Sequence, residues 1–193
     1  MLRPWVACIL LLLAGPVLAQ AGVAEITQFQ IERGEEGILL SAAVRFELPP
    51  VIEDALQKGI PMFFVSEAVL YRHRWYWYDR EVTHVRRHMR LSYQPLTRRW
   101  RLTIAPTVIG NSGVALGQSF DSQEEALAAV QRFSRWKIAE PGDAAPDGRY
   151  DVEFRFRLDV SQLPRPFQIG AVGQAEWNIA VARSQRLTID NPR

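Results

Sequence analysis

Residues that could bind an anionic ligand are concentrated in one stretch of the chain, residues 72–101. This stretch holds nine arginines, all three histidines and six aromatic residues, against two acids, Asp79 and Glu81. Arginine beside tryptophan and tyrosine can bind phosphates, carboxylates or sugar faces through bidentate hydrogen bonds and stacking. We therefore identify a set of candidate binding residues: Arg72, Arg74, Trp75, Trp77, His84, Arg86, His88, Arg90, Arg99 and Arg101.

The same composition also has a purely structural interpretation. Aromatic side chains supply much of the burial in a core without disulfides, so Trp75, Trp77 and Trp100 are equally candidates for the core. The arginines would then form an ordinary solvated face. The scarcity of lysine in the chain indicates either a GC-rich genome or a preference for planar, bidentate contacts.

The histidines do not have the spacing of a metal site. Two residues four apart on a strand are separated by about 13 Å, so His84 and His88 could not bind one ion. On a helix they could, as in the H-E-x-x-H motif, but Val85 stands where that motif needs its glutamate. We predict no metal site and no cofactor.

Signals for nucleophilic catalysis are also weak. Ser112 lies in Asn-Ser-Gly and lacks the G-x-S-x-G elbow of serine hydrolases. The only cysteine, Cys8, lies in the leader described below, so the mature chain has no thiolate and no disulfide. We predict that the protein is not an enzyme, and keep an unrecognised hydrolase with His84 or His88 as its base as an alternative.

The first 21 residues have the pattern of a secretory signal peptide. Arg3 is followed by the apolar run 5–14, which is too short for a membrane span of roughly 20 residues. Small residues predict cleavage after Ala19 or Ala21. We expect a periplasmic protein, or one otherwise secreted across the inner membrane, with no transmembrane span after cleavage and a single β-rich domain over residues 22–193.

The charge balance argues against nucleic acid as a partner. The chain carries 23 Lys and Arg against 21 Asp and Glu, so no field over the whole protein would attract a polyanion. Export makes nucleic acid a still poorer candidate. The basic excess is local to residues 72–101.

Period-two alternation indicates antiparallel strands with one buried and one wet face. It is clearest over residues 38–48 and 150–160, and recurs over 177–189. Residues 34–37 (Gly-Glu-Glu-Gly) predict a hairpin turn. Two helices are predicted, over 50–58 before Gly59 and over 122–135, where Ser122 and Glu125 form a capping box. We predict a mostly β domain, an antiparallel β-sandwich, immunoglobulin-like or related, with two short α-helices.

The basic stretch itself predicts a meander of three strands, over 62–78, 81–94 and 98–105. The first strand is expected to be bent or bulged, because its alternation is unclear after Tyr71. In the second strand one face carries His84, Arg86, His88 and Arg90. Arg87 is the exception on the otherwise apolar opposite face.

The order of motifs along the chain resembles a known family. The motifs are L-P-P-V-I-E-D-A-L-Q-K-G-I-P (48–61), R-H-R-W-Y-W-Y-D (72–79), L-T-R-R-W-R-L (96–102), F-x-S-x-E-E-A-L (120–127) and L-P-R-P-F-Q (163–168), followed by Trp177. Together they resemble the proteobacterial family catalogued as domain of unknown function 4390. The resemblance implies an exported proteobacterial protein whose gene often lies beside one for a nitrogen-regulation-type sensor histidine kinase. It implies no activity, ligand or catalytic residue.

These observations favour a non-enzymatic binding or accessory module of the cell envelope. Its basic and aromatic meander would dock an acidic partner, such as a protein ectodomain, an anionic lipid headgroup or a glycan. The alternative of a carbohydrate-binding module requires Trp75, Trp77 or Trp100 to be exposed as stacking platforms.

Overall fold

The computed structural model describes residues 24–74, 78–109, 115–145 and 148–188. The predicted signal peptide, residues 1–21, and the candidate binding residues Trp75 and Trp77 lie outside this part of the chain. In the described ranges no helix is long and apolar enough to cross a membrane.

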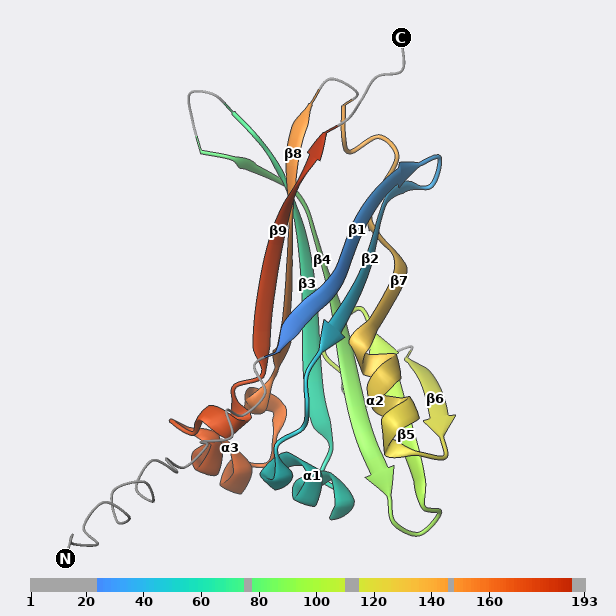
Figure 1. The fold of residues 1–193 in the computed structure, drawn as a ribbon, viewed down its shortest axis with the longest axis vertical. Helices are drawn as coiled ribbons and strands as arrows, with labels where there is room; N and C mark the ends of the chain where they lie inside the picture. The colour runs from blue at the N-terminus through green and yellow to red at the C-terminus, as the bar shows by residue number, and fades with distance from the viewer. Residues whose placement is uncertain (1–23, 75–77, 110–114, 146–147, 189–193) are drawn as a thin grey trace, which may run out of the picture.

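Two antiparallel sheets pack face to face, as predicted (Figure 1). The smaller sheet has the order β1-β2-β7, with β1 (Glu25–Gly34), β2 (Gly37–Arg45) and β7 (Arg132–Ala139). The larger sheet has the order β6-β5-β4-β3-β8-β9, with β3 (Met62–Arg72), β4 (Arg80–Gln94), β5 (Arg99–Ala105), β6 (Leu116–Phe120), β8 (Arg149–Leu158) and β9 (Ala180–Thr188). Sheets of three and six strands differ from the four and three of an immunoglobulin constant domain.

The core between the sheets is built on phenylalanines. Phe156 of β8 lies 5.3 Å from Phe46 and 5.7 Å from Phe64, ring centre to ring centre. Phe133 of β7 meets Phe154 of β8 edge to face at 5.2 Å. The predicted alternation is confirmed, because the even-numbered residues of β8 are buried and face the smaller sheet.

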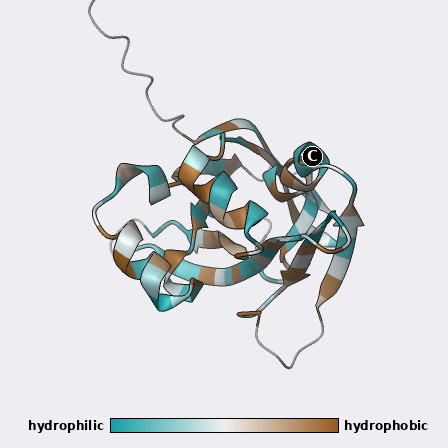
Figure 2. Cartoon of the chain, turned by 90° about the horizontal axis from the view of Figure 1, so that it is seen from below, coloured by the Kyte–Doolittle hydropathy of each residue, from teal (hydrophilic) through white to brown (hydrophobic). Residues whose placement is uncertain are grey.

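In the described part of the chain three α-helices close the sandwich, one more than predicted: α1 (Pro50–Gln57), α2 (Gln123–Gln131) and α3 (Arg165–Ala171). The unpredicted α3 begins in the sequence L-P-R-P, which favours an extended chain. Proline is nevertheless tolerated in a first helical turn, because the N–H groups there have no partner within the helix. Short 3-10 turns, η1 (Val160–Gln162) and η2 (Ala175–Trp177), flank α3, which lies with α1 at one end of the molecule (Figures 1 and 2).

Helix α2 begins as predicted but ends four residues early. The hydroxyl of Ser122 accepts a hydrogen bond from the Glu125 backbone N–H at 3.1 Å, which is half of the predicted capping box. The expected last turn, residues 132–135, belongs to β7 instead, where Phe133 pairs with Ala42 of β2. Pairing with β2 and burial of Phe133 between the sheets outweigh the helical pattern.

The hairpin between β1 and β2 is the predicted turn, with Gly34 opposite Gly37. Gly37 has a φ of +110°, and a Cβ atom there would lie 2.1 Å from the carbonyl oxygen of Ala139. Glycine is therefore required at this position by both backbone conformation and space.

The predicted meander is formed by β3, β4 and β5, and β3 also pairs with β8. Leu70 pairs with Thr83, whereas the next residue, Tyr71, pairs with Glu81, so β4 has one extra residue at this point. The sequence predicts the bulge in the first strand of the meander, whereas the extra residue lies in the second strand, β4. The first strand, β3, ends at Arg72, six residues before its predicted end. The extra residue also changes the direction of the side chains at the ends of β3 and β4.

Candidate functional site

The outer face of the six-stranded sheet, which points away from the smaller sheet, carries the predicted polar residues of β4. His84, Arg86, His88 and Arg90 alternate with inward-facing residues and lie opposite Val69, Glu67, Val65 and Phe63 of β3. The prediction that these four side chains share one face is confirmed. The face continues onto β5, β8 and β9.

Neighbouring acids, from the same strand or an adjacent one, neutralise much of this face. Arg86 lies 3.4 Å from Glu67 of β3, and Arg155 lies 2.7 Å from its β8 neighbour Glu153. Two further pairs are Arg157–Asp159 at 3.4 Å and Arg186–Asp151 at 3.6 Å. In the folded protein the positive charge of residues 72–101 is therefore partly balanced by acids from outside this stretch.

Two arginines of the outer face, Arg90 and Arg101, form no ion pair with any described residue. Arg90 pairs with Thr103, and Arg101 with Ser92, so the two arginines are diagonal neighbours on β4 and β5. Arg101 lies across β6, where a Cβ atom added to Gly117 would come within 3.3 Å of its guanidinium. We call these two residues the Arg90–Arg101 pair.

Another candidate, Arg99, is already engaged, because its guanidinium lies 3.0 Å from Asp121. Arg74 is exposed at the far end of the meander, where its backbone N–H lies 3.4 Å from Asp79 Oδ1. The structure thus spreads the eight described candidate residues along the length of the sheet and does not gather them into one site.

The two candidate histidines of β4 have different environments. His84 is bracketed by Glu67 at 3.9 Å and Glu81 at 3.8 Å. His88 is only 9% exposed, and its Nδ1 atom has no hydrogen-bond partner. Burial lowers the pKa of His88 below its usual value of 6.5, so the ring is neutral at neutral pH and adds nothing to the cationic face.

Arg87, the exception in the predicted pattern, points inward between the sheets. Its guanidinium lies 4.7 Å from the ring centre of Trp136 and 5.4 Å from that of Phe133. Burial lowers its pKa from the ordinary arginine value. Stacking on the two β7 rings compensates part of the loss of hydration, so Arg87 joins the sheets and is not a surface binding residue.

Trp100 does not provide an exposed stacking platform. It is 6% exposed and packs against Tyr93 of β4, with ring centres 5.0 Å apart. The core interpretation is therefore right for this tryptophan. Trp75 and Trp77 lie outside the described residues.

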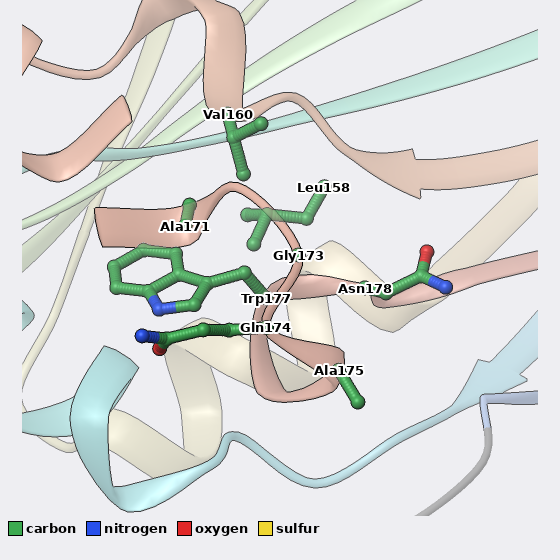
Figure 3. Close-up of a pocket in the computed structure, with 8 residues that line it drawn as sticks. All are labelled: Leu158, Val160, Ala171, Gly173, Gln174, Ala175, Trp177 and Asn178. Carbon is green, nitrogen blue, oxygen red and sulfur yellow. The ribbon is translucent and has the colours of Figure 1, made fainter. Parts of the chain in front are cut away.

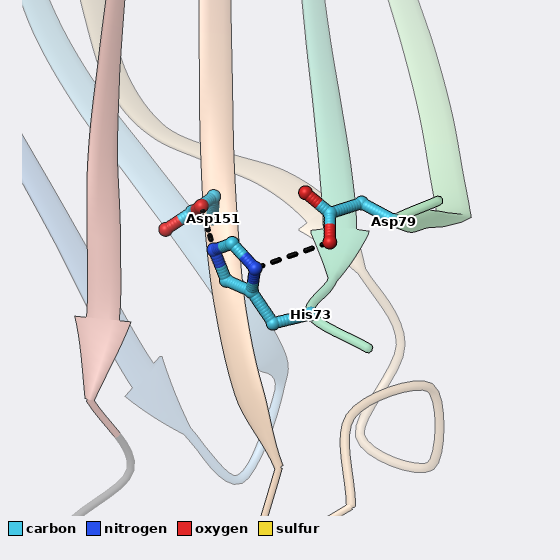
Figure 4. Close-up of side chains that lie close together, drawn as sticks. All are labelled: His73, Asp79 and Asp151. Atoms are coloured by element: carbon cyan, nitrogen blue, oxygen red, sulfur yellow. Dashed lines mark hydrogen bonds and ion pairs between the residues drawn. The ribbon is translucent and has the colours of Figure 1, made fainter. Parts of the chain in front are cut away.

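At the other end of the meander, three residues form a cluster that sequence reasoning missed (Figure 4). His73 lies between two carboxylates, with Nδ1 3.1 Å from Asp79 and Nε2 in contact with Asp151 of β8. His73 follows β3 and Asp79 precedes β4, so their proximity could have been inferred from a hairpin. The pairing of β3 with β8, which brings in Asp151, could not. We call this cluster the carboxylate clamp.

The carboxylate clamp is the one group of histidine and acidic side chains, within the described ranges, whose ligand atoms come within 4.8 Å of one another. Each ring nitrogen of His73 faces a different carboxylate, so only one of them could bind a given ion. Arg186 also lies 3.6 Å from Asp151 and would repel a cation. The geometry is that of an ion-paired link between the β3–β4 connection and β8.

An open pocket of about 450 Å³ lies at the helical end of the sandwich (Figure 3). Leu158, Val160, Ala171 and the buried indole of Trp177 form its apolar part, and Gln174 and Asn178 supply amides. Its lining includes no titratable side chain, so the pocket could hold a small apolar group but has no acid, base or nucleophile for catalysis.

Comparison with known proteins identifies the family. No curated protein and no solved structure matches the chain significantly. A family model described as "Domain of unknown function (DUF4390)" matches residues 21–187, which is nearly all of the described fold. The chain therefore belongs to the DUF4390 family, as its ordered motifs indicated.

Proposed function

We propose that this protein is an exported, non-enzymatic binding module that docks an acidic protein partner on the outer face of its six-stranded sheet. The observation that carries the proposal is the Arg90–Arg101 pair. These two arginines are diagonal neighbours on β4 and β5 and have no carboxylate partner among the described residues, whereas Arg86, Arg155, Arg157 and Arg186 each have one.

The chemistry of the pair suits carboxylates. Each guanidinium presents N–H donors in a planar fork that can bind a carboxylate through two parallel hydrogen bonds. Their cross-strand neighbours Ser92 and Thr103 are short, polar and uncharged, so an approaching chain meets no acidic side chain there. An extended sheet face of this kind fits a protein surface better than a small molecule.

Export is the second part of the proposal and rests on the sequence of residues 1–21. A periplasmic location would place the outer face among the ectodomains of envelope proteins. The family resemblance makes the ectodomain of a sensor histidine kinase the first candidate partner.

The proposal is tested with a charge-matched pair of double variants. Arg90→Ser with Arg101→Ser removes the two unpartnered guanidiniums, whereas Arg155→Ser with Arg157→Ser removes two ion-paired ones from the same face. Binding to immobilised poly-L-glutamate is measured by biolayer interferometry at 50 and 300 mM NaCl. We expect the first variant to bind about tenfold more weakly at low salt, and the second to bind like the wild type.

Equal weakening in both variants would show that only net charge matters and would overturn the proposed site. Vesicles of phosphatidylglycerol and dextran sulfate are measured in parallel. A loss confined to either of these would point to a lipid or a glycan in place of an acidic protein. A signal-sequence cleavage assay in a Gram-negative host, with amino-terminal sequencing of the product, tests export, and a cytoplasmic product with residues 1–21 retained would contradict it.

A further inference from the structure

Two arginines face each other at the end of the sheet that lies opposite α1 and α3. Arg72, the last residue of β3, pairs directly with Arg80, the first residue of β4. Both are exposed, and neither forms an ion pair within the described ranges. Like charges directly opposite each other destabilise an antiparallel pair. An anion bound between the guanidiniums would remove this repulsion.

The carboxylate clamp holds these two arginines in place. His73 follows Arg72 in the chain and Asp79 precedes Arg80, and the His73–Asp79 contact at 3.1 Å closes the strand ends just beyond the arginine pair. The second contact of His73, with Asp151, ties the closed end to β8 (Figure 4). The strands are thus kept together where repulsion between Arg72 and Arg80 would separate them.

Arg72 and Arg80 line a cavity of about 400 Å³ together with the loop between β7 and β8. Its floor is Tyr150 of β8, which is fully buried and whose hydroxyl accepts a hydrogen bond from the Ala145 backbone N–H at 2.7 Å. That bond fixes the loop against the sheet. The cavity is within the size range of pockets that hold small molecules.

Two acids also line the cavity, but each is engaged elsewhere. The carboxylate of Asp143 accepts a hydrogen bond from the Glu140 backbone N–H at 2.7 Å. Glu81 lies opposite the outward-facing Tyr71, with its carboxylate 3.8 Å from His84 Nδ1. The cationic groups in the lining are the guanidiniums of Arg72 and Arg80.

We propose that this cavity is a binding site for a small molecule bearing a phosphate or carboxylate group, held between Arg72 and Arg80. A tetrahedral or planar oxyanion can accept two hydrogen bonds from each guanidinium and would remove the repulsion between them. The site lies at the opposite end of the meander from the Arg90–Arg101 pair. It is independent of the proposed docking function and can exist without it.

The test measures thermal unfolding of the exported chain in a buffer free of multivalent anions, with inorganic phosphate or succinate added to 10 mM at constant ionic strength. Both probes carry the shared oxyanion chemistry, and their difference separates phosphate ligands from carboxylate ligands. We expect at least one of them to raise the midpoint of wild-type unfolding by several degrees, because a ligand that binds only the folded state stabilises it.

Arg72→Ser with Arg80→Ser should abolish this rise, whereas Arg155→Ser with Arg157→Ser should retain it. The milder Arg80→Lys keeps the charge but loses the planar fork, so it should fold and show a smaller rise. Without the probe, Arg80→Ser should unfold at or above the wild-type midpoint, because it removes the repulsion. Unchanged wild-type midpoints with both probes, or an equal rise in the Arg72/Arg80 double variant, would overturn the site.

Discussion

The two faces of the six-stranded sheet are built from alternate residues of the same strands, yet they follow different rules. On the inner face of β8, Tyr150, Val152, Phe154 and Phe156 are buried regardless of which residues lie beside them. On the outer face, an arginine is paired when an acid lies beside it, on a neighbouring strand for Arg86 and on the same strand for Arg155. Burial of the apolar side chains thus follows from the alternation of each strand, whereas which arginines remain unpaired depends partly on how the strands pair in the sheet.

Two neighbouring residues of β4 are exceptions to the pattern of an apolar inner face and a charged outer face. Arg87 lies on the inner face as a charged residue stacked on Phe133 and Trp136, and His88 lies on the outer face but is buried and neutral. The guanidinium of Arg87 is covered by two rings of β7, and His88 is shielded from solvent. Substitutions at these positions and at their neighbours test whether the two faces contribute to stability as differently as their contacts indicate.

The largest expected effect comes from the inner face at Phe156, which is 1% exposed and contacts three other phenylalanines. Phe156→Ala should lower the free energy of unfolding by about 3–5 kcal/mol, because it leaves a cavity between the sheets. The adjacent Arg155→Ala removes a surface ion pair and should lower it by less than about 1 kcal/mol. Urea unfolding measures both, and similar losses would mean that the outer charge network is as structural as the core.

An intermediate effect is expected at Arg87. Arg87→Met keeps an unbranched side chain between the sheets but removes the charge above Trp136 and Phe133, so we expect a loss of about 0.5–2 kcal/mol. Arg86→Met, on the opposite face, removes the pair with Glu67 and should change stability by less than about 1 kcal/mol. If Arg87→Met proves neutral or stabilising, the guanidinium is tolerated in the core and does not stabilise it.

This contrast also explains how much of the molecule could be predicted. The sandwich, the strands β2 and β8 and the cap at Ser122 all follow from local alternation and capping chemistry. The end of α2 did not, because residues 132–135 have a helical pattern but are held in β7 by their pairing with β2.

The candidate sites were less predictable because they depend on pairing between distant segments. Nothing in residues 72–101 shows that Glu67 neutralises Arg86 or that Asp151 reaches His73. The Arg72–Arg80 pair requires knowledge of the exact register on each side of the bulge. The alternation of residues predicts that Arg90 lies on the solvent-facing side of its strand. Only the strand order shows that its neighbours on β3 and β5 are not acidic.

The smallest effect on stability is expected at His88 and should be visible only in the pH dependence of unfolding. Burial is the main cause of its lowered pKa; Arg86 and Arg157 act in the same direction, and Asp159 and Glu67 oppose it. In the unfolded chain the ring has its ordinary pKa of 6.5, so below that pH the unfolded state binds the proton first. The protonation of His88 therefore does not affect the free energy of unfolding at pH 7. As the pH falls below 6.5 it lowers this free energy by at most about 1.4 kcal/mol for each pH unit.

Replacing His88 with phenylalanine removes this titration together with the buried Nδ1 atom that has no partner. His88→Phe should match the wild type at pH 7 and lose less stability between pH 6.5 and 5, measured by urea unfolding at each pH. His84→Phe, on the same face and 29% exposed, retains His88 and should keep its acid-sensitive contribution. If His88→Phe loses stability with acid as steeply as the wild type, His88 is hydrated in solution, and the outer face is open at a point where the structure closes it.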